Sequence, residues 1–190
     1  SMRKIYDDNN PQNIITINYN CSYPWFTTQN QIFNNGLLTL SLIDFFDSLG
    51  YRVDLRFYEI SKTGNQILYI DTILKSSGEK INLQKFYFAF CNPSFLRRII
   101  FRVTETTQGL SSGWTGGYGR CMPTEEIKKI LGINENNIFI NWPEQMGVKG
   151  ENIEHDIEAF LNTIILGDYI KIDEEKFNIC DDKHVLKKKK

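Results

Sequence analysis

A strand, a helix and a second strand follow one another near the start of the chain, and this order constrains the fold more than any other feature. Ile14 to Tyr19 is rich in β-branched and apolar residues, which is typical of a strand buried on both faces. Apolar residues recur at helical spacing from Gly36 to Leu49, and Gly50 stands where a helix C-terminal cap belongs. Tyr51 to Ile60 alternates apolar with charged residues, which predicts a strand with one exposed face. The pattern indicates two parallel strands joined by a crossover helix.

Shorter patterns predict the remaining elements. A turn at 62–65 and a β-branched run at 66–75 indicate an antiparallel hairpin, and Asn92 and Pro93 separate two short helical or mixed segments. The sequence also predicts a polar loop at 21–35, a surface loop at 104–120, a helix at 124–131 capped by Thr124, a strand at 137–141 and a helix at 151–166. Alternating strands and helices favour an α/β fold with a Rossmann-like mixed sheet and helices on both faces.

Length and composition indicate one globular domain. The 190 residues suffice for a substantial core, and 41% hydrophobic with 24% charged residues excludes disordered, collagenous and coiled-coil classes. We expect a flexible N-terminal lead at 1–13, the α/β domain at 14–172 and a charged, flexible tail at 173–190.

Charge, cysteines and hydropathy bear on partners and compartment. A net charge of -1 predicts no global attraction to nucleic acid or anionic membrane. The four cysteines are far apart and form no C-x-x-C pair, so neither a zinc site nor a disulfide framework is predicted. No stretch approaches the ~20 apolar residues that span a membrane, which favours a cytoplasmic protein with reduced thiols.

A polar segment follows the first predicted strand, where α/β folds place their sites. Asn18, Asn20 and Ser22 have the spacing of the D-x-S-x-S metal-binding loop of von Willebrand A-type domains, which this segment resembles. Mg²⁺ sites normally include carboxylate charge, so this neutral set predicts a degenerate site that binds Mg²⁺ weakly, if at all. The alternative is a polar turn, and we predict no cofactor.

A second candidate site is the loop at 109–120, where five glycines accompany Trp114, Tyr118 and Arg120. The two exposed aromatic residues suit a partner contact, and Trp25 in the loop after the first strand extends the same predicted face. Backbone amides at Gly113, Gly116 and Gly117 are alternative contacts for phosphate. The segment lacks the G-x-x-x-x-G-K-[ST] pattern of phosphate-binding loops. A loop with no binding role is the third interpretation.

Basic and nucleophilic residues supply the remaining candidates. Arg97, Arg98 and Arg102 form a local cluster that suits phosphate or an acidic partner, or is a solvated helix face. The four lysines at 187–190 would attract any polyanion, although such a run is usually a disordered tail. Cys21 is the one candidate nucleophile, and no motif supplies a partner histidine.

Four short segments carry a family resemblance: residues 33–38, 49–55, 92–98 and 117–120. They resemble an uncharacterised family of phage and mobile-element proteins whose core is similar to a von Willebrand A-type domain. The resemblance covers roughly residues 14 to 166 and implies a sheet with helices on both faces and a degenerate metal site. It implies no catalytic activity, and fold alone does not give function.

Without a catalytic constellation, we expect a non-enzymatic protein-binding or scaffold domain that holds a partner through loops at the carboxyl end of the sheet. The first alternative is an enzyme or ligand sensor that binds a phosphorylated small molecule or nucleotide at 109–120. The second is nucleic-acid binding through the arginine cluster and the lysine tail. The oligomeric state is open.

Overall fold

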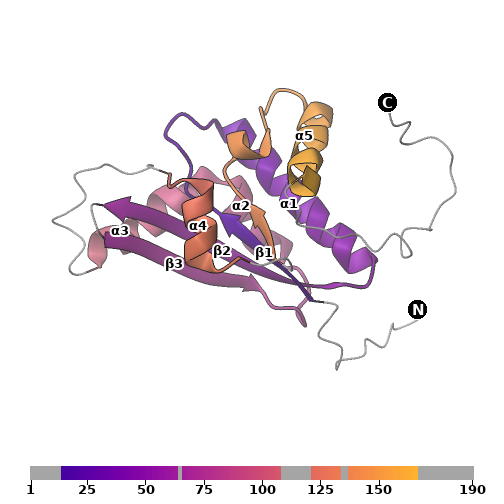
Figure 1. Ribbon diagram of the computed structural model, residues 1–190, viewed down its shortest axis with the longest axis horizontal. Coiled ribbons are helices and arrows are strands. Elements are labelled where there is room, and N and C mark those ends of the chain that lie inside the picture. The colour runs from indigo at the N-terminus through magenta and orange to yellow at the C-terminus, as the bar shows by residue number, and fades with distance from the viewer. Residues whose placement is uncertain (1–13, 64–65, 108–120, 134–136, 167–190) are drawn as a thin grey trace, which may run out of the picture.

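The computed structural model describes residues 14–63, 66–107, 121–133 and 137–166, which form one α/β domain (Figure 1). Its strands are β1 (Ile14–Asn20), β2 (Arg52–Thr63), β3 (Gln66–Lys75) and β4 (Asn137–Ile140). Its helices are α1 (Gln29–Ser48), α2 (Leu83–Cys91), α3 (Phe101–Thr106), α4 (Thr124–Leu131) and α5 (Ile153–Leu166). A π-helical segment, η2 (Phe95–Ile100), precedes α3, and a 3-10 helix, η3 (Pro143–Met146), follows β4.

The four strands form one mixed sheet in the order β3-β2-β1-β4. β1 pairs in parallel with β2 on one side and with β4 on the other, while β3 pairs antiparallel with β2 at the edge. This arrangement confirms the crossover between the first two strands and the hairpin after them. The predicted bounds of the hairpin's second strand, 66–75, are also confirmed.

The helix after β1 begins seven residues earlier than its apolar spacing predicts. Thr28 closes a capping box with Gln31: the Thr28 hydroxyl accepts from the Gln31 amide, and the Gln31 side chain accepts from the Thr28 amide. Only Ile32 and Phe33 are apolar in the first two turns of α1, too few for hydrophobic periodicity to detect them. The predicted loop at 21–35 is therefore wrong beyond Thr28. Gly50 has a φ of 87°, as a residue just past a helix end requires.

The main core lies between one face of the sheet and α1, α2, η2 and α5 (Figure 1). From the sheet it takes residues at alternate strand positions, Ile17 and Tyr19 from β1, then Val53, Leu55 and Phe57 from β2. A smaller cluster of Ile60, Met122, Ile127 and Phe139 holds α4 on the opposite face. Helices thus cover both faces, as predicted, although α4 covers only part of its face.

Two predictions at the ends of helices are wrong. The predicted loop at 104–120 starts too early, because α3 continues through Thr104 to Thr106, whose hydroxyls donate to the carbonyls of Ile100 and Arg102 within the helix. Thr124 is the first residue of α4 and not its cap, which is Pro123. The Thr124 hydroxyl instead accepts a hydrogen bond from Asn141 at 2.8 Å.

Two close contacts join the helices of the main face. Gly36 of α1 lies against the end of α2, where an added Cβ would stand 2.7 Å from the carbonyl oxygen of Phe90. The buried carboxylate of Asp156 in α5 accepts hydrogen bonds from the Asn34 side chain and from the backbone amides of Lys149 and Gly150. Asp156 therefore fastens α5 and the segment before it to α1.

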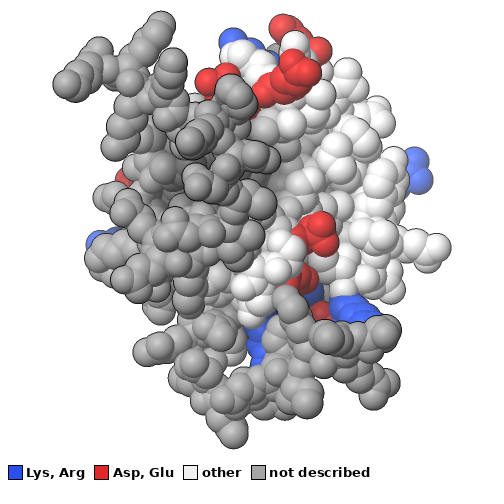
Figure 2. Space-filling model, turned by 90° about the vertical axis from the view of Figure 1, so that its right-hand side faces the viewer, with Lys and Arg blue, Asp and Glu red and all other residues white. Residues whose placement is uncertain are grey.

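No helix in the described ranges is long and apolar enough to cross a membrane. Figure 2 shows a described surface that is mostly uncharged, with acidic side chains gathered at its upper edge and a mixed group of acidic and basic side chains lower down. The predicted N-terminal lead at 1–13 and the tail at 173–190 lie outside the described residues, as does the predicted loop from residue 108 to residue 120.

Candidate binding pocket at the carboxyl end of the sheet

The carboxyl ends of β1 and β4 meet where an open α/β sheet usually holds its ligand. From β1 the chain passes through α1 to β2 on one side, whereas β4 lies on the other side, so the topology reverses between β1 and β4. Such a switch point leaves a crevice beyond the strand ends. The side chains that lie there are those of Asn20, Ser22, Asn35 and Asn141.

These side chains form hydrogen bonds with one another and with the backbone around the crevice. Asn20 donates to the Asn141 side chain at 2.9 Å and accepts from the Ser22 amide at 3.1 Å. The Ser22 hydroxyl lies 3.2 Å from both the carbonyl and the amide of Ile60. Asn35 donates to the backbone carbonyl of Asn141 at 3.1 Å. The crevice is therefore filled by a buried amide network.

The three predicted metal-site positions take part in protein hydrogen bonds. Asn18 lies on the same strand face as Asn20 but deeper, and its side-chain oxygen accepts from the Tyr58 hydroxyl at 2.9 Å. No group of three or more His, Cys, Asp or Glu side chains that could hold a metal occurs in the described part of the chain. Nothing in these residues indicates a metal site, and a neutral amide and hydroxyl set fits Mg²⁺ poorly.

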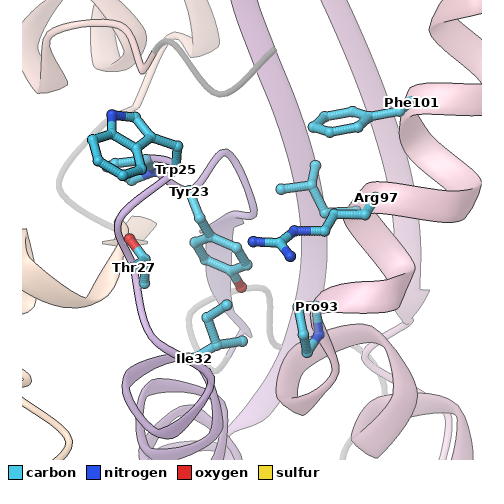
Figure 3. A pocket seen from close by; sticks show the side chains of 9 residues that line it. Tyr23, Trp25, Thr27, Ile32, Pro93, Arg97 and Phe101 are labelled. Carbon is cyan, nitrogen blue, oxygen red and sulfur yellow. The ribbon is translucent and has the colours of Figure 1, made fainter.

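A small pocket lies beside this crevice, between the loop that follows β1 and the segment from Pro93 to Phe101 (Figure 3). Its volume is about 100 Å³. We call it the Trp25 pocket; its lining includes Tyr23, Trp25, Thr27, Ile32, Arg97 and Phe101.

The base of the loop is fixed, whereas its tip is exposed. The Tyr23 hydroxyl lies 2.8 Å from that of Tyr19 in the core, and the Thr27 hydroxyl donates to Glu144 at 3.2 Å. Between these two anchors Trp25 is 82% exposed and Phe26 is 56% exposed, and their rings pack edge to face. A large aromatic side chain is thus presented to solvent by a loop whose ends are fastened.

Arg97 enters the pocket from the opposite wall. In Figure 3 its guanidinium extends from η2 toward the ring of Tyr23. Arg97 has no ion pair with any described residue, and Arg98 next to it is exposed. Arg102, one turn further on, lies 3.9 Å from Glu105. The predicted basic cluster therefore divides into Arg97 at the pocket and a solvated helix face.

The structure brings together two residues that the sequence assigned to different roles. Trp25 was predicted as a partner contact and Arg97 as a phosphate contact, and both line one pocket. Sequence reasoning missed Tyr23, Thr27 and Phe101; Pro24 beside Trp25 was a weak signal for an ordered loop. The other predicted contacts, Gly113, Trp114, Gly116, Gly117, Tyr118 and Arg120, lie outside the described residues.

The thiols near this end of the sheet are poor nucleophiles. Cys21 is buried, and the loss of hydration raises the pKa of its thiol, with the nearby Glu59 carboxylate adding to the effect. Burial also raises the pKa of Cys121 to about 12, and its sulfur lies 3.0 Å from the Ser22 carbonyl. Both groups stay protonated near neutral pH, unlike a catalytic thiolate.

Comparison with known proteins gives a family and no activity. A family model described as "Domain of unknown function (DUF7192)" matches residues 1–168. No curated protein and no solved structure matches the chain. Since the family model covers the whole described domain, the chain belongs to the DUF7192 family of domains of unknown function.

Proposed function

We propose that this chain is a non-enzymatic protein-binding or scaffold domain whose partner contacts the loops at the carboxyl end of the sheet. The observation that carries the proposal is the Trp25 pocket, where an exposed tryptophan and an arginine without an ion pair among the described residues face one cavity. Tryptophan and arginine are the residues most enriched at the energetic centres of protein interfaces.

The size of the pocket favours a protein partner over a cofactor. Sites for small molecules usually enclose roughly 300 to 1,000 Å³. The Trp25 pocket, at about 100 Å³, suits one side chain of a docked segment. The fastened ends of its loop lower the entropy cost of ordering it when a partner binds.

The charge of the pocket favours an acidic segment. Arg97 and Arg98 are both exposed, and neither has an ion pair within the part of the chain that the structure describes. A carboxylate next to an apolar side chain would pair with Arg97 while the apolar group contacts Trp25 and Phe101. We therefore propose a partner segment that combines an aspartate or glutamate with an apolar residue.

The test is capture of the partner by two variants. Trp25→Ala and Arg97→Gln should each reduce the affinity for the native partner at least ~10-fold, as expected of interface centres. Phe45→Ala on α1 and Lys129→Gln on α4 remove an exposed aromatic residue and an exposed cation elsewhere, and should leave capture unchanged. The partner is first identified by cross-linking in cells of the host, and affinities are then measured with purified proteins.

Two results would contradict the proposal. Equal affinity of wild type and both pocket variants for the cross-linked partner would exclude the Trp25 pocket. Loss of every captured protein after nuclease treatment, with a steep dependence on salt, would instead support nucleic-acid binding through Arg97, Arg98 and Arg102. Binding of a nucleotide or phosphorylated small molecule at residues 109–120 remains the other prediction.

The resemblance to von Willebrand A-type domains and to phage proteins is also part of this proposal. We propose a von Willebrand A-like core, supported by the α1 crossover between parallel strands and by the polar segment that ends β1. Origin in a phage or mobile element, with residence in the bacterial cytoplasm or on the virion, is proposed on the resemblance of the four short segments given above.

A further inference from the structure

A polar groove lies on the sheet face that α4 covers only in part. Its volume is about 440 Å³, which falls in the range of small-molecule sites. Asn18, Arg56, Tyr58 and Asn137 line its strand side, and Leu131 and Ile133 after α4 form an apolar wall. We call it the Arg56 groove. It shares no lining residue with the Trp25 pocket.

The floor of the groove is held rigidly by hydrogen bonds across three strands. The Tyr58 hydroxyl donates to the Asn18 side-chain oxygen at 2.9 Å, and the Asn18 amide nitrogen lies 3.4 Å from the Asn137 side-chain oxygen. Asn18 and Tyr58 are almost fully buried. These hydrogen bonds hold the floor of the groove in one arrangement, so that Arg56 and Asp54 project from a rigid surface.

Opposite charges lie side by side in the groove. Asp54 and Arg56 are two residues apart on β2, so both point to the same sheet face. One Arg56 guanidinium nitrogen lies 3.5 Å from the Tyr58 hydroxyl and the other lies 3.7 Å from an Asp71 carboxylate oxygen. Arg56 is 41% exposed, so donors remain for a further partner. One oxygen of Asp54 accepts from the Ser77 amide.

We propose that the Arg56 groove binds a free α-amino acid with an apolar side chain. Its carboxylate pairs with Arg56, its ammonium group pairs with Asp54, and its side chain lies against Leu131 and Ile133. The amides of Asn18 and Asn137 line the remaining polar side.

Other ligand classes fit the groove less well. A purely anionic ligand would meet two carboxylates near Arg56, those of Asp54 and Asp71. A metal ion lacks a cluster of three ligating side chains in the described part of the chain. A wholly apolar ligand would cover the exposed part of the Arg56 guanidinium and offer it no acceptor. A neutral polyol would use the amides but would not need both charges.

Binding is tested on the wild-type chain by calorimetry and thermal shift with defined probes. We expect at least one of L-leucine, L-isoleucine, L-valine, L-methionine and L-phenylalanine to bind and to raise the melting temperature at about 10 mM. For leucine, the analogues 4-methylpentanoate and isoamylamine each lack one charged group and should bind at least ~10-fold more weakly. Absence of binding by all five amino acids, or equal binding of ribose or glucose, overturns the proposal.

Variants then locate the site. Arg56→Gln and Asp54→Asn should each weaken amino-acid binding at least ~10-fold, whereas Arg97→Gln in the Trp25 pocket should not change it. Circular dichroism verifies that each variant is folded, and the analogue series on the wild type does not depend on any variant. Unchanged affinity in folded Arg56→Gln overturns the assignment. Because Arg97→Gln tests partner capture and Arg56→Gln tests amino-acid binding, failure of one proposal leaves the other intact.

Discussion

At the scale of single residues, uncharged side-chain amides form the hydrogen bonds between polar side chains of neighbouring strands in this sheet. Asn20 and Asn141 bond to each other across the ends of β1 and β4, and Asn18 bonds to Tyr58 deeper on the same face. A side-chain amide both donates and accepts hydrogen bonds. Amides on two neighbouring strands can therefore satisfy each other's hydrogen-bonding groups without a buried charge and its desolvation cost. The Asn141 side chain also accepts from the Trp142 amide, which fixes the chain as it leaves β4.

The one buried carboxylate of α5 gives a prediction about stability. Asp156 accepts three hydrogen bonds, from the Asn34 side chain at 2.9 Å and from the amides of Lys149 and Gly150 at 2.7 and 2.9 Å. Asp156→Asn places a donor against these donors and should reduce the free energy of unfolding by about 2 kcal/mol. Urea denaturation measures the loss. Glu154→Gln, an exposed change on the same helix, is the control and should have little effect. Equal stability of Asp156→Asn and wild type would show that the three contacts are unimportant.

The buried thiols give a prediction about alkaline pH. Burial raises the pKa of Cys91 from 9.0 to about 11 and that of Cys121 to about 12, so the folded chain retains thiol protons that the unfolded chain releases. This contribution to stability is complete below about pH 9 and is lost as pH rises toward 11 and 12. Denaturant unfolding across this window should show falling stability.

Iodoacetamide labelling at about pH 8 provides a second readout. Cys21, Cys91 and Cys121 should react far more slowly in the folded than in the denatured chain, because the folded thiols are protonated and mostly covered. Peptide mass spectrometry distinguishes the sites. Equal labelling of Cys21 in both states would contradict its burial.

Sequence patterns predict the roles of some residues well and of others poorly. The difference depends on how far along the chain the residues that each one contacts lie. Gly50 was identified as a helix cap because its neighbours alone determine that role. The local pattern at Asn20 allows a degenerate metal loop or a polar turn, and neither interpretation includes its partner Asn141, which lies 121 residues away. The Trp25 pocket likewise needs Arg97, and no local pattern reports that contact.

At the scale of elements, α1 determines how the parts of the domain are arranged. Its first residues adjoin the Trp25 pocket, its middle contacts α2 at Gly36, and its Asn34 holds Asp156 of α5. The apolar half of the helix was predicted from spacing. The polar half was not, because the capping box at Thr28 provides its start without any hydrophobic period.

The contact between α1 and α2 gives a prediction at this scale. In Gly36→Ala the new Cβ would stand 2.7 Å from the carbonyl oxygen of Phe90 and 2.9 Å from the Cys91 sulfur. Alanine favours a helix interior over glycine by about 1 kcal/mol, but separating two packed helices costs about 1 to 3 kcal/mol. We expect a net loss of stability in thermal unfolding. Gly78→Ala, with no atom within 4 Å of the new Cβ, should be neutral. A Gly36→Ala variant more stable than wild type would contradict the close approach.

At the scale of the whole molecule, the fold class follows from the sequence, whereas the groove on the partly covered face does not. Local patterns indicated that β1 and β2 are parallel and that β3 returns beside β2, whereas the pairing of β4 with the other edge of β1 had no local signal. How much of a sheet face α4 covers depends on its eight-residue length and on where Ile127 packs. Neither the length of α4 nor the packing position of Ile127 produces a recognisable periodicity in the sequence.

The shared core predicts cooperative unfolding. One cluster takes residues from each of the four strands and from α1, α2 and α5, and Trp142 packs at its margin. Tryptophan fluorescence and far-ultraviolet circular dichroism should therefore give coincident urea transitions, as a two-state domain does. Two separate transitions would show that α4 and its small cluster unfold independently of the main core.

The position of β1 in the sheet has a consequence for synthesis on the ribosome. Among the described strands, β1 is made first and lies in the interior of the finished sheet, yet β4, which covers one of its edges, is made about 120 residues later. Until residue 140 has left the exit tunnel, that edge of β1 can accept a strand from another nascent chain. Slow translation of the residues between β3 and β4 should accordingly yield more insoluble product. Synonymous codons that speed translation of this stretch should reduce the insoluble fraction.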